Sequence, residues 1–154
     1  MVKRMTKKLV LTISLMVLLL SGCSKKVVPL QIKDVCAQPK GTVVEIQGYI
    51  SLPKEIETIQ LMRGQRIESV GLNLFLMTKA DATGEAVMTT FWVSDKSEPN
   101  KIKPLPKGYT WNDLLVYTND GKPVGAGTVI TVTGETVPQD KVGCRVNVKK
   151  IELP

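Results

Sequence analysis

The sequence predicts an all-β domain behind a short apolar N-terminal segment. Five segments alternate apolar with polar residues, which is the period of a half-buried strand. The chain has 154 residues, enough for one compact core and too few for two. Apolar residues make up 43% of the chain and charged residues 23%, close to the average of globular proteins. Collagen-like and wholly disordered chains are therefore excluded.

The first 22 residues have the layout of a cleaved signal helix. An apolar run from Leu9 to Leu20 follows a basic start. The basic residues are Lys3, Arg4, Lys7 and Lys8. A spanning helix needs about 20 apolar residues, and this run is shorter. We therefore expect residues 1–22 to be a signal peptide and not a permanent membrane span.

The residues Leu20-Ser21-Gly22-Cys23 resemble the lipobox of bacterial lipoproteins. The resemblance covers residues 1–23 and implies cleavage between Gly22 and Cys23, with acyl chains such as palmitate attached to Cys23. Each buried CH₂ adds about 0.8 kcal/mol, so two or three chains hold a domain on a bilayer. Because Ser24 is not aspartate, the resemblance implies the periplasmic face of the outer membrane in a diderm organism. In any other organism it implies the outer face of the cytoplasmic membrane.

Composition argues against several classes of site. The chain has no histidine, the commonest general base and metal ligand. Zinc sites and Ser-His or Cys-His nucleophiles therefore lose their basis, and we expect no metal and no other cofactor. No spacing of the acidic residues selects a carboxylate pair for catalysis. We expect no enzyme activity.

The net charge does not indicate a nucleic-acid-binding protein. The chain carries 21 basic and 14 acidic residues, a formal charge of +7, but four of the basic residues lie within residues 1–22. Without that segment the charge falls to +3, which is ordinary for a globular domain.

Two cysteines remain after Cys23, namely Cys36 and Cys144. An exported domain lies in a disulfide-permissive compartment, so the sequence predicts a bond between them. The alternative is two separate buried thiols that act as small apolar residues.

We expect a lipidated flexible tether over residues 23–31 and the folded domain over residues 32–154. The expected strands are 42–50, 72–77, 86–93, 128–136 and 142–153. The second and third strands form a hairpin across the polar residues 79–84. The apolar alternation of the last strand changes parity at Lys149-Lys150, which predicts a bulge. Gly48 permits a bulge or a tight coil.

Two stretches leave alternatives open. Residues 52–69 fit a short helix or a long loop. Residues 110–118 fit a helical turn, because Thr110 and Asp113 resemble a capping box. They equally fit a small hairpin, because Asn119-Asp120-Gly121 is a turn signal.

The glycine-flanked segments 41–50 and 127–136, with the closing segment 141–153, resemble strands of the OB fold. The resemblance spans residues 32–154 and implies a small five-stranded OB-like barrel with a short helix or irregular connection between its third and fourth strands. The alternative is another small β-barrel or a sandwich.

The same resemblance implies where a ligand would bind, on the face of the second and third strands. The candidate residues on or near that face are Tyr49, Arg63, Arg66, Phe75, Lys79, Trp92 and Arg145. Aromatic and basic residues together suit single-stranded nucleic acid or oligosaccharide. The same aromatic residues also fit ordinary core packing.

We expect a non-catalytic binding or adaptor module in the cell envelope, with a protein partner there. The alternative is OB-type binding of a glycan or a nucleic acid at the membrane surface. The extracytoplasmic address makes nucleic acid the less favoured ligand.

Overall fold

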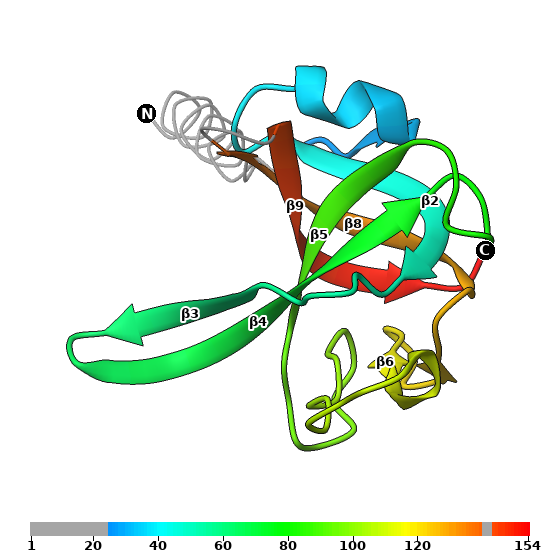
Figure 1. Cartoon of the computed structure of the whole chain (residues 1–154). Helices are drawn as coiled ribbons and strands as arrows, with labels where there is room; N and C mark the ends of the chain where they lie inside the picture. Colours follow the sequence, from blue (N-terminus) through cyan, green and yellow to red (C-terminus); the bar gives the residue numbers. More distant parts are fainter. Residues whose placement is uncertain (1–24, 140–142) are drawn as a thin grey trace, which may run out of the picture.

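The computed structural model describes residues 25–139 and 143–154, and the fold is mainly β (Figure 1). Within these residues the strands form a seven-stranded sheet and a small two-stranded sheet, beside two 3-10 helices. The strands of the large sheet are β1 (Val28–Leu30), β2 (Val43–Ser51), β3 (Thr58–Arg63), β4 (Arg66–Met77), β5 (Ala86–Trp92), β8 (Val129–Gln139) and β9 (Gly143–Glu152). The small sheet pairs β6 (Val116–Tyr117) with β7 (Pro123–Val124), and the helices are η2 (Ile32–Ala37) and η3 (Trp111–Asp113).

The strand order of the large sheet is β1-β2-β8-β9-β5-β4-β3, with an additional pairing of β2 with β4. Besides β1, β2 pairs with two further strands: with β8 over Val43–Tyr49 and with β4 over Tyr49–Ser51. The β5–β9 and β1–β2 pairs are parallel, and the other pairs are antiparallel.

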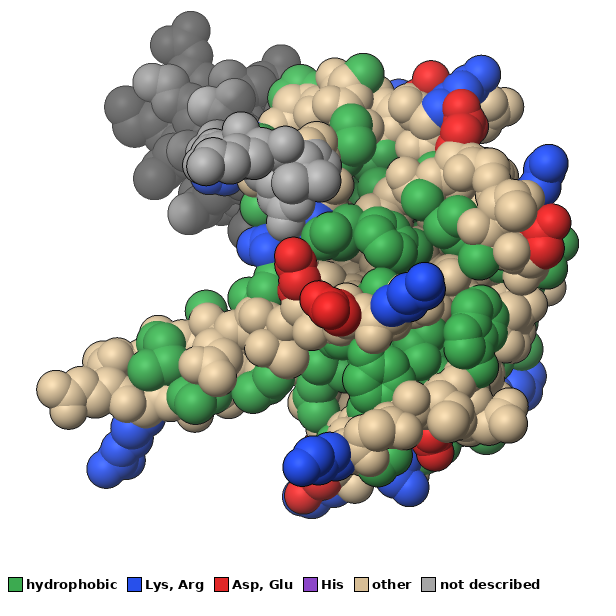
Figure 2. Space-filling model, viewed as in Figure 1, with side chains coloured by type: hydrophobic (Ala, Val, Ile, Leu, Met, Phe, Trp, Pro, Cys, Tyr) green, Lys and Arg blue, Asp and Glu red, His purple; other side chains and the backbone are tan. Residues whose placement is uncertain are grey.

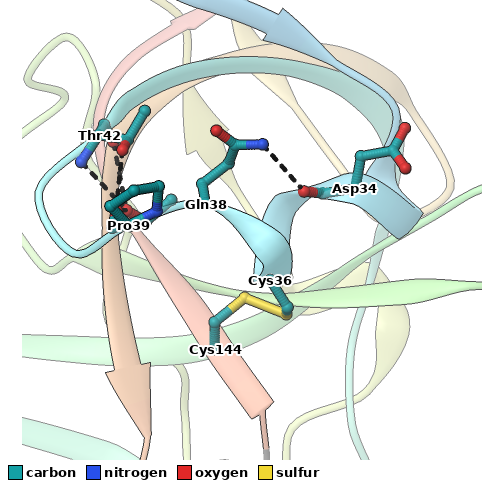
Figure 3. The surroundings of a disulfide bond; sticks show 7 residues. Asp34, Cys36, Gln38, Pro39, Thr42 and Cys144 are labelled. Atoms are coloured by element: carbon teal, nitrogen blue, oxygen red, sulfur yellow. Dashed lines mark hydrogen bonds between the residues drawn. A yellow bond between two sulfur atoms is a disulfide. The ribbon is translucent and has the colours of Figure 1, made fainter.

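The core is built from the inward faces of these strands. In β4 the residues Leu72, Leu74 and Leu76 alternate inward and are buried, as the period of a strand requires. Ile32 and Val35 of η2 cover one side of the same core. The predicted disulfide is confirmed: Cys36 in η2 is bonded to Cys144 in β9, with a Cα–Cα distance of 5.2 Å (Figure 3).

Strands form at all five segments where alternation predicted them. The predicted hairpin is the β4–β5 pair. The predicted bulge is also present, because the β8–β9 register shifts between Thr133 and Gly134 and leaves Lys149 without a partner residue. Gly48 carries no bulge, since the β2–β8 register runs through it unbroken. It allows close packing instead: a Cβ there would lie 2.8 Å from Cγ of Leu76.

Residues 52–69 were expected to form a short helix or a long loop, and both expectations are wrong. These residues contain β3 and the start of β4, joined by the two-residue turn Gly64-Gln65. Gly64 has φ +63°, a conformation that glycine adopts freely and that tight hairpin turns need. Residues 58–70, which we call the arm, extend away from the rest of the sheet (Figure 1).

Both alternatives for residues 110–118 are correct in part. The Thr110–Asp113 capping box forms at η3, where the Thr110 backbone N–H donates to Oδ2 of Asp113 at 2.6 Å. Val116–Tyr117 then forms the short hairpin with Pro123–Val124. The segment expected as a tether also contains a strand, because Val28–Leu30 pairs with Val44–Ile46.

Candidate functional site

The sequence-predicted binding residues do not gather in one place. Arg63 and Arg66 lie at the tip of the arm, and Lys79 lies in the exposed turn after β4. Tyr49 pairs with Met77 at the opposite end of β4 and lines a separate hollow with Gly48 and Thr78. The remaining three candidates share one surface.

That surface is the outer face of β4, β5 and β9. Phe75 lies opposite Met88, and Met88 lies opposite Arg145, so Phe75, Met88 and Arg145 form a row across the strands. Phe75 and Arg145 are half-buried. Nε of Arg145 is buried and has no hydrogen-bond partner among the described residues. The row therefore combines an aromatic ring with a guanidinium group.

Trp92 sits on the same face but is engaged by the protein itself. Its indole Nε1 donates to Oδ1 of Asn147 at 2.9 Å, which links β5 to β9. Its ring lies 3.4 Å from where a Cβ of Gly71 would stand, so it covers that part of the strand pair. Beside it, the buried Thr90 hydroxyl donates to Oδ1 of Asn73 at 2.8 Å. We conclude that Trp92 links the two strands of the sheet through its indole N–H, which is not free for a ligand.

The arm carries exposed apolar side chains that the sequence analysis missed. Leu61, Met62 and Ile67 are 48%, 49% and 53% exposed. Figure 2 shows hydrophobic side chains along the arm and on the body beside its base. The near-alternating segment from Thr58 to Met62 was the available signal, but the charged residues after it obscured the strand.

A groove also lies at the base of the arm. Its volume is about 470 Å³, and its walls are mostly apolar. One wall is formed by the arm base and β4, through Thr58, Val70 and Leu72, and the other by residues 104–109. The Tyr109 hydroxyl donates to the backbone oxygen of Lys54 at 3.1 Å, which ties the second wall to the chain before the arm.

An ion-pair cluster lies on the outer face of β8. Oε1 of Glu135 accepts from Nζ of Lys149 at 2.8 Å and from Nζ of Lys25 at 2.9 Å. The Lys149 hydrogen bond, followed by that of Lys25, lowers the pKa of Glu135 to about 2. The cluster attaches the chain at Lys25 to the body.

Gly22 and Cys23 lie outside the described residues. Within the described ranges, no group of three or more His, Cys, Asp or Glu side chains could hold a metal ion. No helix there is both long and apolar enough to cross a membrane.

Comparison with known proteins adds no assignment, because no family model and no curated protein matches the chain. The function must therefore be argued from the geometry of the arm, the groove and the outer face.

Proposed function

We propose that the protein is a lipid-anchored, non-catalytic adaptor of the cell envelope that binds a protein partner through its arm. The exposed apolar side chains Leu61, Met62 and Ile67 are the observation that carries this proposal. Single exposed apolar residues are common on protein surfaces, but a group of them on a projecting ribbon is typical of an interaction site.

The proposal includes an OB-like barrel. In its support, β2, β4, β5, β9 and β8 each pair with two others of the set, in the ring β2-β4-β5-β9-β8-β2. A closed ring of strands is what a five-stranded barrel requires. The arm would then be the extended connection between the first and second barrel strands, one of the loops that flank the ligand face in OB folds.

The anchoring proposal rests on the lipobox Leu20-Ser21-Gly22-Cys23. A lipid on Cys23 would hold the domain close to the bilayer, because β1 begins at Val28 and an extended chain spans at most about 3.6 Å per residue. In Cys23→Ala we expect the protein to leave the membrane fraction and to lose its acyl chains. A variant that stays membrane-bound and acylated would contradict the anchor.

The adaptor proposal is tested by crosslinking in intact cells, followed by mass spectrometry of the copurified proteins. The arm variant carries Leu61→Ser, Met62→Ser and Ile67→Thr. The matched control removes exposed apolar side chains elsewhere, with Val27→Thr, Trp111→Ser and Leu153→Ser, whose residues are 42%, 44% and 43% exposed.

We expect one dominant envelope protein with the wild type and the control, and a yield at least about tenfold lower with the arm variant, the loss typical of an interface hot spot. Equal yields from all three forms, or no protein partner at all, would contradict an arm-based adaptor.

A second candidate function is binding of a single-stranded nucleic acid or an oligosaccharide on the outer face. The buried Nε of Arg145, which has no hydrogen-bond partner among the described residues, lies in the row with Phe75 and favours it. Salt-dependent binding that disappears in the double variant Phe75→Ala, Arg145→Ala would support it. Binding that the double variant leaves unchanged would count against this face.

A further inference from the structure

The groove leads onto one face of the arm, where Val70, Ile67 and Met62 are apolar and Gln60 is polar. Side chains alternate along a strand, so Thr58 and Met62 of β3 lie on the same face. Thr58 lines the groove, and Met62 is paired with Ile67 near the tip. Val70 also lines the groove, between Ile67 and the base of the arm. This mostly apolar surface therefore leads from the groove outward along the arm.

The backbone beside this surface is open to a further strand. β3 ends the strand order of the large sheet, and among the described residues it pairs with β4 alone. Its outer edge can hydrogen-bond an extended segment of another chain, as in recognition by strand addition. A segment bound there would run between β3 and residues 104–109.

Unpaired positive charge lies at the groove end of this surface. Lys107 lines the groove, whereas Arg66 is exposed near the tip on the opposite face of the arm, because it precedes Ile67 and pairs with Arg63. Within the part of the chain that the structure describes, neither forms an ion pair, whereas Arg63 is paired with Glu68 at 2.7 Å. An acidic side chain on a segment bound to this surface would complement Lys107.

We propose that this surface binds an extended segment of the partner protein by strand addition to β3. One apolar side chain of the segment fills the groove, and an acidic side chain pairs with Lys107. The inference rests on the proposed adaptor function and adds the chemistry of the segment that the adaptor recognises.

The probe for this proposal is a phage-displayed library of random peptides of about nine residues, long enough to cover a typical strand. The full chain in detergent is the bait. Thr58→Phe fills the groove, with Ile59→Phe on the opposite face of the arm as its control. Lys107→Glu reverses the charge at the groove, with Lys103→Glu on the same exposed segment as its control.

We expect enriched peptides that alternate apolar residues and carry an acidic residue. Their affinity should fall at least tenfold on Thr58→Phe and on Lys107→Glu, and change less than about twofold on either control, since interface energy concentrates in few residues. Replacing the acidic residue of a peptide with lysine should restore binding to Lys107→Glu.

The proposal is overturned if the selection enriches no peptide on the wild type relative to Thr58→Phe. It is also overturned if the enriched peptides bind both groove variants as tightly as they bind the wild type. Its failure is distinct from failure of the adaptor function. If a partner still crosslinks through the arm but no peptide binds at the groove, the adaptor function is retained. Only strand addition at the groove is then disproved.

Discussion

The body of the sheet and the arm use the same kinds of residue for different ends. In the body, β2, β8, β9 and β5 pair on both sides, and Leu74, Val132 and Val146 are fully buried. In the arm, β3 and residues 66–69 of β4 pair with each other alone among the described strands, and about half of Met62 and Ile67 is exposed. The apolar side chains of the body are buried in the core when the chain folds. Those of the arm remain available to another molecule, and this contrast underlies the proposed function.

The largest effect should come from the disulfide that closes the body. The double variant Cys36→Ala, Cys144→Ala releases a loop with a sequence separation of 108. On the chain-entropy model we expect the free energy of unfolding to fall by about 4–5 kcal/mol. Urea unfolding of both forms measures the difference. A loss below about 1 kcal/mol would mean that the bond does not constrain the unfolded chain as proposed.

Equivalent truncations in the two regions should differ next most strongly. Leu74 is 0% exposed, so Leu74→Ala should cost about 3 kcal/mol through lost burial and a cavity. Met62 is 49% exposed, so Met62→Ala should cost less than about 0.5 kcal/mol. Thermal or urea unfolding compares them. A costly Met62→Ala would show that the arm packs against the body and is not free.

Glycine substitutions extend the same comparison to the backbone. A Cβ at Gly134 in β8 would collide with the backbone oxygen of Asn147 and lie 2.6 Å from Cγ1 of Val146. Gly134→Ala should therefore cost about 2–3 kcal/mol. A Cβ added at Gly64 in the arm turn would meet no other described residue beyond its chain neighbours within 4 Å, and the strain of φ +63° should cost about 1 kcal/mol. Equal costs measured by urea unfolding would argue against tight packing at β8.

The smallest effect concerns pH and the ion pairs of Glu135. Because the lysine partners lower the pKa of Glu135 from 4.5 to about 2, folding favours its ionised form. The stabilisation is complete above pH 4.5 and is lost as the pH falls through about 2. Unfolding measured across this range should show a slope that Glu135→Gln reduces. An NMR titration that gives Glu135 its ordinary pKa would contradict the cluster.

Local pattern was enough to predict the body. Its strands alternate because one face is buried, and Lys149 interrupted that alternation where the bulge lies. The arm could not be recognised in this way, because both of its faces meet solvent and no buried face imposes a period. The charges of Arg63, Arg66 and Glu68 further obscured its alternation.

The binding surfaces were harder to predict than the fold. The groove joins Thr58 and Leu72 to residues 104–109, which are distant in the chain, so no local motif marks it. The residue types at Trp92 and Arg145 indicated a ligand-binding face. Only the structure revealed that the Trp92 indole N–H is hydrogen-bonded to Asn147. Pairings between distant segments decide which candidate side chains are free.

The most direct test of the account is site-specific photocrosslinking in intact cells from one position on the arm and one on the body. A photoreactive residue at Met62 probes the arm, and one at Lys150, on the outer face of β9, probes the body. We expect a discrete protein adduct from Met62 and none from Lys150. An equal pattern of adducts from both positions, or none from Met62, would contradict the claim that the arm is the binding element.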